Sequence, residues 1–175
     1  VKKATGKYVL FLNPDTVVDK NSISFCLDYL KGHPEVGAAS VKVLLDNGKL
    51  DYSCHRGFPT PWNSFCWFSG FSKFFPRSEL FSGYTLGSKN LDEIHEVDAI
   101  NGAFFMITKE LGDKLNWFDT DFFWNGEDLD FCFRIKESGY KIMFLPDQKI
   151  IHFKGTSGGH IKGSKTFYSR FDVMK

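Results

Sequence analysis

Stretches of apolar residues alternate with helical patterns over the first part of the chain. Residues 8–13 form an apolar run that ends in an amide and a Pro-Asp pair, and this run predicts a buried strand. Asp19 then opens a helical pattern that ends at Gly32. Residues 36–45 again predict a strand, and the Asp-Asn-Gly turn after it predicts a hairpin with a returning strand at 49–53. Strand, helix and strand in this order are typical of an α/β fold.

The segment 54–93 interrupts this order. It is rich in aromatic residues, glycine, proline and serine, it shows no regular period, and it is too long for a simple connection between two elements. We expect a long aromatic loop that serves in recognition, because loops on a rigid scaffold commonly carry binding functions. An insertion that packs over the hydrophobic core is the alternative.

Regular patterns return after this segment. Residues 97–107 predict a strand that carries an Asn-Gly pair, and residues 108–115 predict a short helix. A second helix begins at an acidic pair and ends at Gly139. Residues 141–145 and 149–153 then predict two short strands, or one strand broken at a proline.

Polar side chains stand at the ends of these elements. Asn13 and Asp15 follow the first strand, Glu127 and Asp128 open a helix, and His152 lies at the end of the last strand. In α/β sheets ligands bind outside the carboxyl ends of strands, so we expect these side chains to share one site. Each also has a plainer interpretation, as a turn residue, as acids that complement a helix dipole, or as a buried structural histidine.

Composition and charge narrow the classes of protein. With 175 residues, 42% hydrophobic and 17% aromatic, residues 1–175 are expected to form a single domain. The formal charge of +1, without a basic block, argues against nucleic acid as a partner. The four cysteines lack metal-ligand spacing and are predicted to be free and buried. No apolar run could span a bilayer and no signal peptide is visible, so a cytoplasmic location is expected.

Three motifs in this order resemble a known family. The runs GKYVLFLNPDTVV, VDAINGAFFMI and FFWNGEDLDFCFRIKESGYKIMFLPDQKIIHFKGTS resemble the family 2 glycosyltransferases, especially bacterial rhamnosyltransferase-like members. The resemblance implies an α/β fold of GT-A type, with a Rossmann-like mixed sheet flanked by helices. It also implies an N-terminal truncation, because members of the family begin with a strand and helix that cradle the nucleotide base.

The resemblance assigns donor and metal roles to residues of this chain. Asn13-Pro-Asp15 occupies the place of the family's DxD element, so Asp15 is expected to bind Mn²⁺ or Mg²⁺ at the donor diphosphate, with Asn13 beside it. Asn13 replaces the first carboxylate, as in rhamnosyltransferase-like members, and His152 matches a histidine that supplies a further metal ligand. Asn101 and Gly102 lie where the family's strand approaches the donor sugar.

Further donor contacts are weaker candidates. Asp98 is expected near the donor, while Arg56, Lys154 and Ser157 are candidates for phosphate contact, with simple solvent exposure as the alternative.

The acceptor side of the site is expected at the acidic helix start. Asp128 corresponds to the catalytic base that removes a proton from the acceptor hydroxyl. Glu127 is expected to orient the acceptor and Trp124 to stack on a sugar face, although both are equally compatible with packing roles.

The implied activity is an inverting transfer of rhamnose or a hexose from a dTDP- or UDP-sugar to a glycan or lipid-linked acceptor, in cell-surface polysaccharide synthesis. Segment 54–93 would then contain the acceptor region, and its mixture of aromatic and basic residues suits shallow contact with the inner face of a membrane. Two other classes stay open. One is a glycoside hydrolase in which Asp15, Glu127 and Asp128 flank the bond, and the other is a non-catalytic glycan-binding module.

Overall fold

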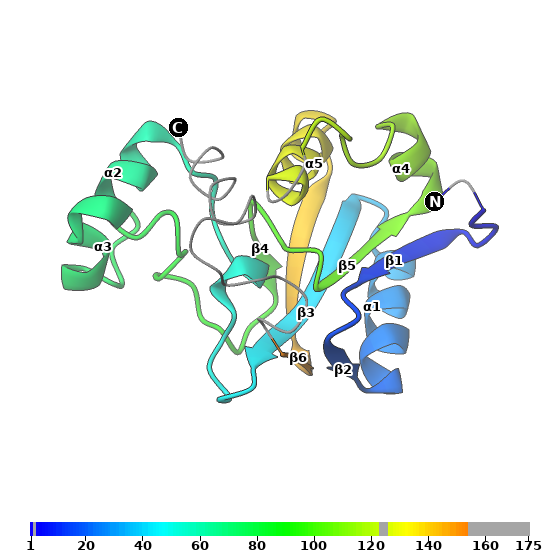
Figure 1. Ribbon diagram of the computed structural model, residues 1–175, viewed down its shortest axis with the longest axis horizontal. Coiled ribbons are helices and arrows are strands. Elements are labelled where there is room, and N and C mark those ends of the chain that lie inside the picture. Colours follow the sequence, from blue (N-terminus) through cyan, green and yellow to red (C-terminus); the bar gives the residue numbers. More distant parts are fainter. Residues whose placement is uncertain (2, 123–125, 154–175) are drawn as a thin grey trace, which may run out of the picture.

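A mixed six-stranded sheet forms the centre of the molecule, and helices flank it (Figure 1). The computed structural model describes residues 1, 3–122 and 126–153. The strands follow the order β1-β5-β3-β6-β2, and β4 pairs with β6. β1, β3 and β6 run in one direction and the others oppose them. The strands are β1 (Tyr8–Leu12), β2 (Thr16–Val18), β3 (Val36–Leu45), β4 (His95–Glu96), β5 (Phe104–Thr108) and β6 (Lys141–His152). The predicted α/β fold with a mixed sheet is confirmed.

β3 lies in the middle of the sheet, and its small residues let the helices approach. Its first six residues are all buried, which explains the continuous apolar run in the sequence. A Cβ atom at Gly37 would lie 2.7 Å from Leu111 and 2.9 Å from Ile135, so two helices pack directly on this glycine. The four cysteines are free and buried, as predicted.

The helices beside the sheet begin and end as their capping residues predict. They are α1 (Lys20–Gly32), α4 (Lys109–Lys114) and α5 (Glu127–Glu137). The Asp19 side chain accepts from the backbone N–H of Asn21, and the hydroxyl of Thr108 accepts from that of Leu111. Gly139 follows α5 with a φ of 86°, a left-handed conformation that favours glycine.

Two of the predicted strands are longer in the prediction than in the structure. The strand predicted at 97–107 begins only at Phe104, because Asp98 and Ala99 donate their backbone N–H groups to the carbonyl of Arg56 instead of to a strand of the sheet. The return at 49–53 forms one bridge, Leu44 to Leu50, and then a short 3₁₀ helix, η1 (Tyr52–Cys54).

The last strand is continuous. β6 runs through Pro146, with a shift in its register against β3 between Val41 and Lys42. β2 was not predicted, and it pairs with the end of β6.

The predicted aromatic loop at 54–93 contains two helices, α2 (Pro61–Ser69) and α3 (Phe71–Phe74), which lie to one side of the sheet (Figure 1). Thr60 caps α2 and a proline begins it, but apolar residues surround the helix and hide its period. α2 and α3 pack against each other and neither has extensive contact with a strand, so these two helices do not cover the core, whereas Phe58, Leu86 and Leu91 of the same segment pack against it. In the part of the chain that the structure describes, no helix has both the length and the apolar character needed to cross a membrane.

Two histidines join the ends of this insertion. His55 is 1% exposed, and its Nε2 lies 2.7 Å from Nε2 of His95 on β4. Both rings contact Phe144 of β6. Burial, reinforced by the His95 charge, lowers the pKa of His55 from 6.5 to about 4. Protonation of both rings would place like charges in contact.

We expect this histidine pair to make folding stability depend on pH. Between pH 6.5 and about 4 the unfolded chain binds the proton that folded His55 excludes, so stability falls as the pH falls, by about 1.4 kcal/mol per pH unit. The His55→Gln variant should lose less stability on acidification, as measured by urea unfolding near neutral pH and near pH 5. Ile107→Val, a core change that costs about 1 kcal/mol, should keep the wild-type slope. An unchanged slope in His55→Gln would contradict the assignment.

Candidate active site

Strand ends meet at one edge of the sheet and carry polar residues there. β1 and β3 end at this edge, β5 begins there, and the end of β6 pairs with β2 and β3 through His152. The strand directions therefore bring together side chains that are far apart in the sequence. These side chains are Asn13, Asp15, Asp51, Asn101 and His152.

His152 lies at the centre of this group and is 5% exposed. Its Nε2 lies 3.2 Å from Oδ1 of Asp15 and 3.3 Å from Nδ2 of Asn13, and its Nδ1 lies 3.4 Å from Oδ2 of Asp51. The backbone of Phe153 also donates to the carbonyl of Asp15 at 2.9 Å. The structure thus brings three of the predicted donor and metal residues into one buried polar cluster.

Asp51 belongs to this cluster and was missed in the sequence. It is 3% exposed, and its Oδ1 accepts from the backbone N–H of Ser53 at 3.1 Å and from its hydroxyl at 2.6 Å. Asn101 donates to Oδ2 of Asp51 at 3.3 Å and to the hydroxyl of Ser53 at 2.6 Å. The sequence did contain a signal for Asp51. It is an acid that comes shortly after the 36–45 strand and its turn, just as Asp15 comes shortly after the first strand. Its carboxylate can hold a proton on Nδ1 of His152 and so direct Nε2 toward Asp15.

The facing atoms of Asp15 and His152 fit a divalent cation. A carboxylate oxygen and an imidazole nitrogen only 3.2 Å apart need a proton or a cation between them, and both are donors that Mn²⁺ or Mg²⁺ accepts. Within residues 1, 3–122 and 126–153, no three His, Cys, Asp or Glu side chains are grouped to hold a metal ion. Among the described residues, Asp15 and His152 would therefore supply two ligands, and substrate phosphates commonly complete such a coordination.

The other predicted donor residues divide into two groups. Asn101 joins the cluster directly, and a Cβ atom at Gly102 would lie 3.9 Å from Oδ1 of Asn13, so Gly102 is its neighbour. Asp98 has different contacts, because it accepts from Nζ of Lys136 at 2.9 Å and from the backbone of Phe58 at 3.3 Å. Those contacts join α5 to the insertion. Trp124, Lys154 and Ser157 lie outside the described residues.

Asp128 lies in a second polar group at the start of α5. Its Oδ2 lies 2.6 Å from the guanidinium of Arg56, and its Oδ1 accepts from the backbone N–H of Leu129 at 2.8 Å. Both charged side chains are largely buried, at 16% and 12% exposure. Burial alone lowers the pKa of Arg56, but Asp128 and then Tyr84 outweigh it and the pKa is raised. Arg56, a candidate for phosphate contact, is in this structure the partner of Asp128.

Glu127 differs from its neighbour because none of the described residues forms an ion pair with it. Burial raises the pKa of its carboxyl, and the charge of Asp128 adds to the effect, against the opposing influence of its backbone N–H and Arg56. Its Oε2 is buried without a hydrogen-bond partner among the described residues. A carboxyl in this environment is ready to receive a hydrogen bond from a ligand.

One short segment connects the two polar groups. Arg56 bridges to Ala99, the thiol of Cys132 lies 3.8 Å from the carbonyl of Ile100, and Asn101 reaches the His152 cluster. Two consecutive residues therefore contact different groups: Ile100 contacts α5, and Asn101 contacts the His152 cluster. This connection fixes the two polar groups relative to each other.

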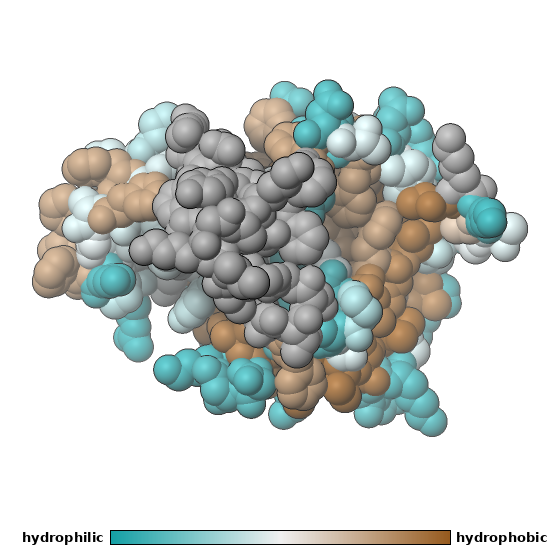
Figure 2. All heavy atoms as spheres, viewed as in Figure 1, coloured by the Kyte–Doolittle hydropathy of each residue, from teal (hydrophilic) through white to brown (hydrophobic). Residues whose placement is uncertain are grey.

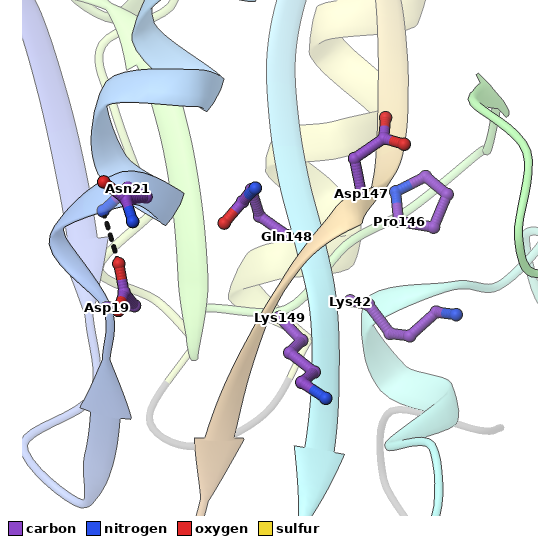
Figure 3. A pocket seen from close by; sticks show the side chains of 7 residues that line it. All are labelled: Asp19, Asn21, Lys42, Pro146, Asp147, Gln148 and Lys149. Atoms are coloured by element: carbon purple, nitrogen blue, oxygen red, sulfur yellow. Dashed lines mark hydrogen bonds between the residues drawn. The ribbon is translucent and has the colours of Figure 1, made fainter.

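A separate cavity of about 480 Å³ lies between the start of α1 and the irregular part of β6 (Figure 3). Its lining contains no predicted site residue, and Asp19 there is already engaged as the cap of α1. We therefore place the site at the strand ends. The cavity is lined by Asp19, Asn21, Lys42, Pro146, Asp147, Gln148 and Lys149.

Comparisons with known proteins identify the relatives of this chain. The profile of the family described as glycosyltransferase like family 2 matches residues 1–165. The rhamnosyltransferase WbbL of Escherichia coli (strain K12) is 26% identical over 156 residues, which are 87% of this chain and 54% of that protein, so the chain spans about half the length of this relative. A crystal structure of GalNAc-T7 with UDP, GalNAc and Mn²⁺ matches with a TM-score of 0.58 at 16% identity, over 98% of this chain and 33% of the other.

The structural match shows that the fold is that of a GT-A glycosyltransferase, as the resemblance implied. The family profile covers nearly the whole chain, including the strand ends and the α5 start that form the two polar groups. The chain therefore belongs to glycosyltransferase-like family 2.

Proposed function

We propose that this site transfers a sugar, with inversion, from a nucleoside diphosphate to a hydroxyl of a glycan or lipid-linked acceptor in cell-surface polysaccharide synthesis. The pairing of Asp15 with His152 at the strand ends carries the proposal. The sugar would be rhamnose or a hexose on dTDP or UDP, which is supported by a rhamnosyltransferase relative and by a structural neighbour solved with UDP.

The His152 cluster would hold the donor. Asp15 and His152 would bind Mn²⁺ or Mg²⁺, and the bound ion would neutralise the charge that develops on the leaving diphosphate. Asn13 and Gly102 would border the sugar, since the absence of a side chain at Gly102 leaves room for it. The buried Oδ1 of Asn101 has no hydrogen-bond partner within the described ranges and would accept from a donor hydroxyl.

Asp128 would act on the acceptor. The acceptor oxygen forms a bond to the anomeric carbon, its proton passes to the Asp128 carboxylate, and the bond from that carbon to the diphosphate oxygen breaks with its electron pair. Attack from the face opposite the leaving group inverts the anomeric configuration. Arg56 fixes the orientation of the carboxylate, and Glu127 beside it would accept a hydrogen bond from the acceptor.

The metal site can be tested by titrating Mn²⁺ into the protein and following free Mn²⁺ by electron paramagnetic resonance, with UDP, dTDP or inorganic pyrophosphate present. We expect diphosphates to strengthen Mn²⁺ binding. Asp15→Ala and His152→Ala should weaken it by more than the roughly 10–100-fold that loss of a supporting partner costs. Each variant removes one of the two ligands that the described residues would supply.

Asp128→Asn is the matched control, because it alters a carboxylate outside the His152 cluster and should leave Mn²⁺ binding nearly unchanged. Equal Mn²⁺ binding by all variants would contradict the site. Glycan binding or cleavage without any metal-dependent nucleotide binding would instead support the binding-module or hydrolase alternative.

Asp51 is expected to act through His152 as a positioning residue. Asp51→Ala should weaken Mn²⁺ binding by roughly 10–100-fold, and Asp51→Asn, which retains an acceptor for Nδ1, should restore part of it. A loss of thermal stability with unchanged Mn²⁺ affinity, or no recovery of affinity in Asp51→Asn, would indicate a purely structural role.

The two acids of α5 should have separable effects on nucleoside diphosphate release from dTDP-rhamnose or UDP-hexose donors. Asp128→Asn should lower kcat by on the order of 10²–10⁴, the usual contribution of a general base. Glu127→Gln should mainly raise KM, because its carboxyl would bind the acceptor. If Glu127 were the base, its raised pKa would determine where kcat falls as the pH is lowered. The Glu127→Gln variant would then lose this fall in kcat at acidic pH.

A further inference from the structure

The insertion presents an unusual apolar surface. α2 and α3 meet at Gly70, whose φ of 85° turns the chain, and together they project away from the sheet as the part that we name the α2–α3 lobe, residues 61–75 (Figure 1). Apolar side chains gather on this lobe in Figure 2. Their exposure ranges from 37% to 79%, for Trp62, Phe65, Trp67, Phe68, Phe71, Phe74 and Phe75. Soluble proteins rarely expose so many large apolar residues together without a binding role.

Contacts among the rings hold this surface in place. The ring of Phe81 lies 5.7 Å from that of Phe71, 5.2 Å from that of Phe75 and 6.2 Å from that of Trp62. The indole N–H of Trp62 donates to the carbonyl of Leu80 at 2.8 Å. The rings of Trp62, Phe71 and Phe75 therefore pack around Phe81. Phe68 and Phe74 are the most exposed apolar side chains of the lobe, at 65% and 79%.

Lys73 is the one charged residue of the lobe, and Arg77 and Glu79 follow the lobe in the sequence. All three are exposed, and Lys73 and Arg77 have no ion-pair partner in the described part of the chain. Exposed tryptophan and phenylalanine bordered by lysine and arginine match the boundary between acyl chains and anionic headgroups.

We propose that the α2–α3 lobe docks on a lipid bilayer with anionic headgroups. Phe68 and Phe74 enter the headgroup–acyl boundary, and Lys73 and Arg77 contact the lipid charges. Such headgroups are typical of the cytoplasmic leaflet, where a lipid-linked acceptor would be reached. The docking uses none of the residues of the His152 cluster, so it can succeed or fail independently of the proposed transfer reaction.

The test is sedimentation of the whole chain with vesicles of phosphatidylcholine alone or with about one third phosphatidylglycerol. We expect stronger binding to the anionic vesicles, weakened by salt. Phe68→Ser combined with Phe74→Ser should reduce the partition coefficient at least about tenfold. Lys73→Gln should reduce it about fivefold on anionic vesicles only. Phe133→Ser, which removes a ring 49% exposed on α5, is the control and should bind as the wild type does.

Because Phe68 and Phe74 are highly exposed, the double variant should keep its circular dichroism and its Mn²⁺ binding, which excludes misfolding as the cause. No binding to either vesicle, or equal loss in Phe133→Ser, would overturn the proposal. Self-association in analytical ultracentrifugation that the double variant abolishes, without vesicle binding, would assign the lobe to a second copy of the chain and also overturn it.

Discussion

The position of His152 between two carboxylates is the constraint on which the site depends. His152 pairs with Thr16 of β2 and Leu45 of β3, so the register of the sheet decides which side chains surround its ring. A shift of one residue would turn the imidazole to the other face and leave the buried Asp51 without one of its donors. The same pairing that completes the edge of the sheet therefore brings Asp15 within 3.2 Å of the ring.

The acid at the start of α5 depends on a second, weaker connection. Arg56 contacts Asp128 through its side chain and Ala99 through its backbone, and Ala99 is two residues before Asn101. A largely buried ion pair of this kind adds little net stability, because desolvation offsets much of the attraction. Its value here is geometric, since it fixes the direction of a carboxylate relative to the cluster that would hold the donor.

Local signals explain what could be predicted from the sequence. The helix after Asp19 was predicted correctly because capping and periodicity involve neighbouring residues. The strand at 97–107 was predicted too long, because Asp98 and Ala99 hydrogen-bond to Arg56 and an apolar run does not reveal its partner. Asp15 was recognisable as a strand-end acid within a motif. Asp51 was not, because its role follows only from the pairing of three strands.

The ends of the insertion connect the proposed membrane-docking lobe to the proposed transfer site. His55 meets His95, and the next residue, Arg56, meets Asp128, so the chain enters the insertion beside the proposed base. The α2–α3 lobe has little contact with the sheet, so the contacts of the flanking residues His55, Arg56 and Asp98 are among those that connect it to the rest of the fold. A lobe docked on lipid, as proposed, would therefore be joined to the Arg56–Asp128 pair through residues 57–60.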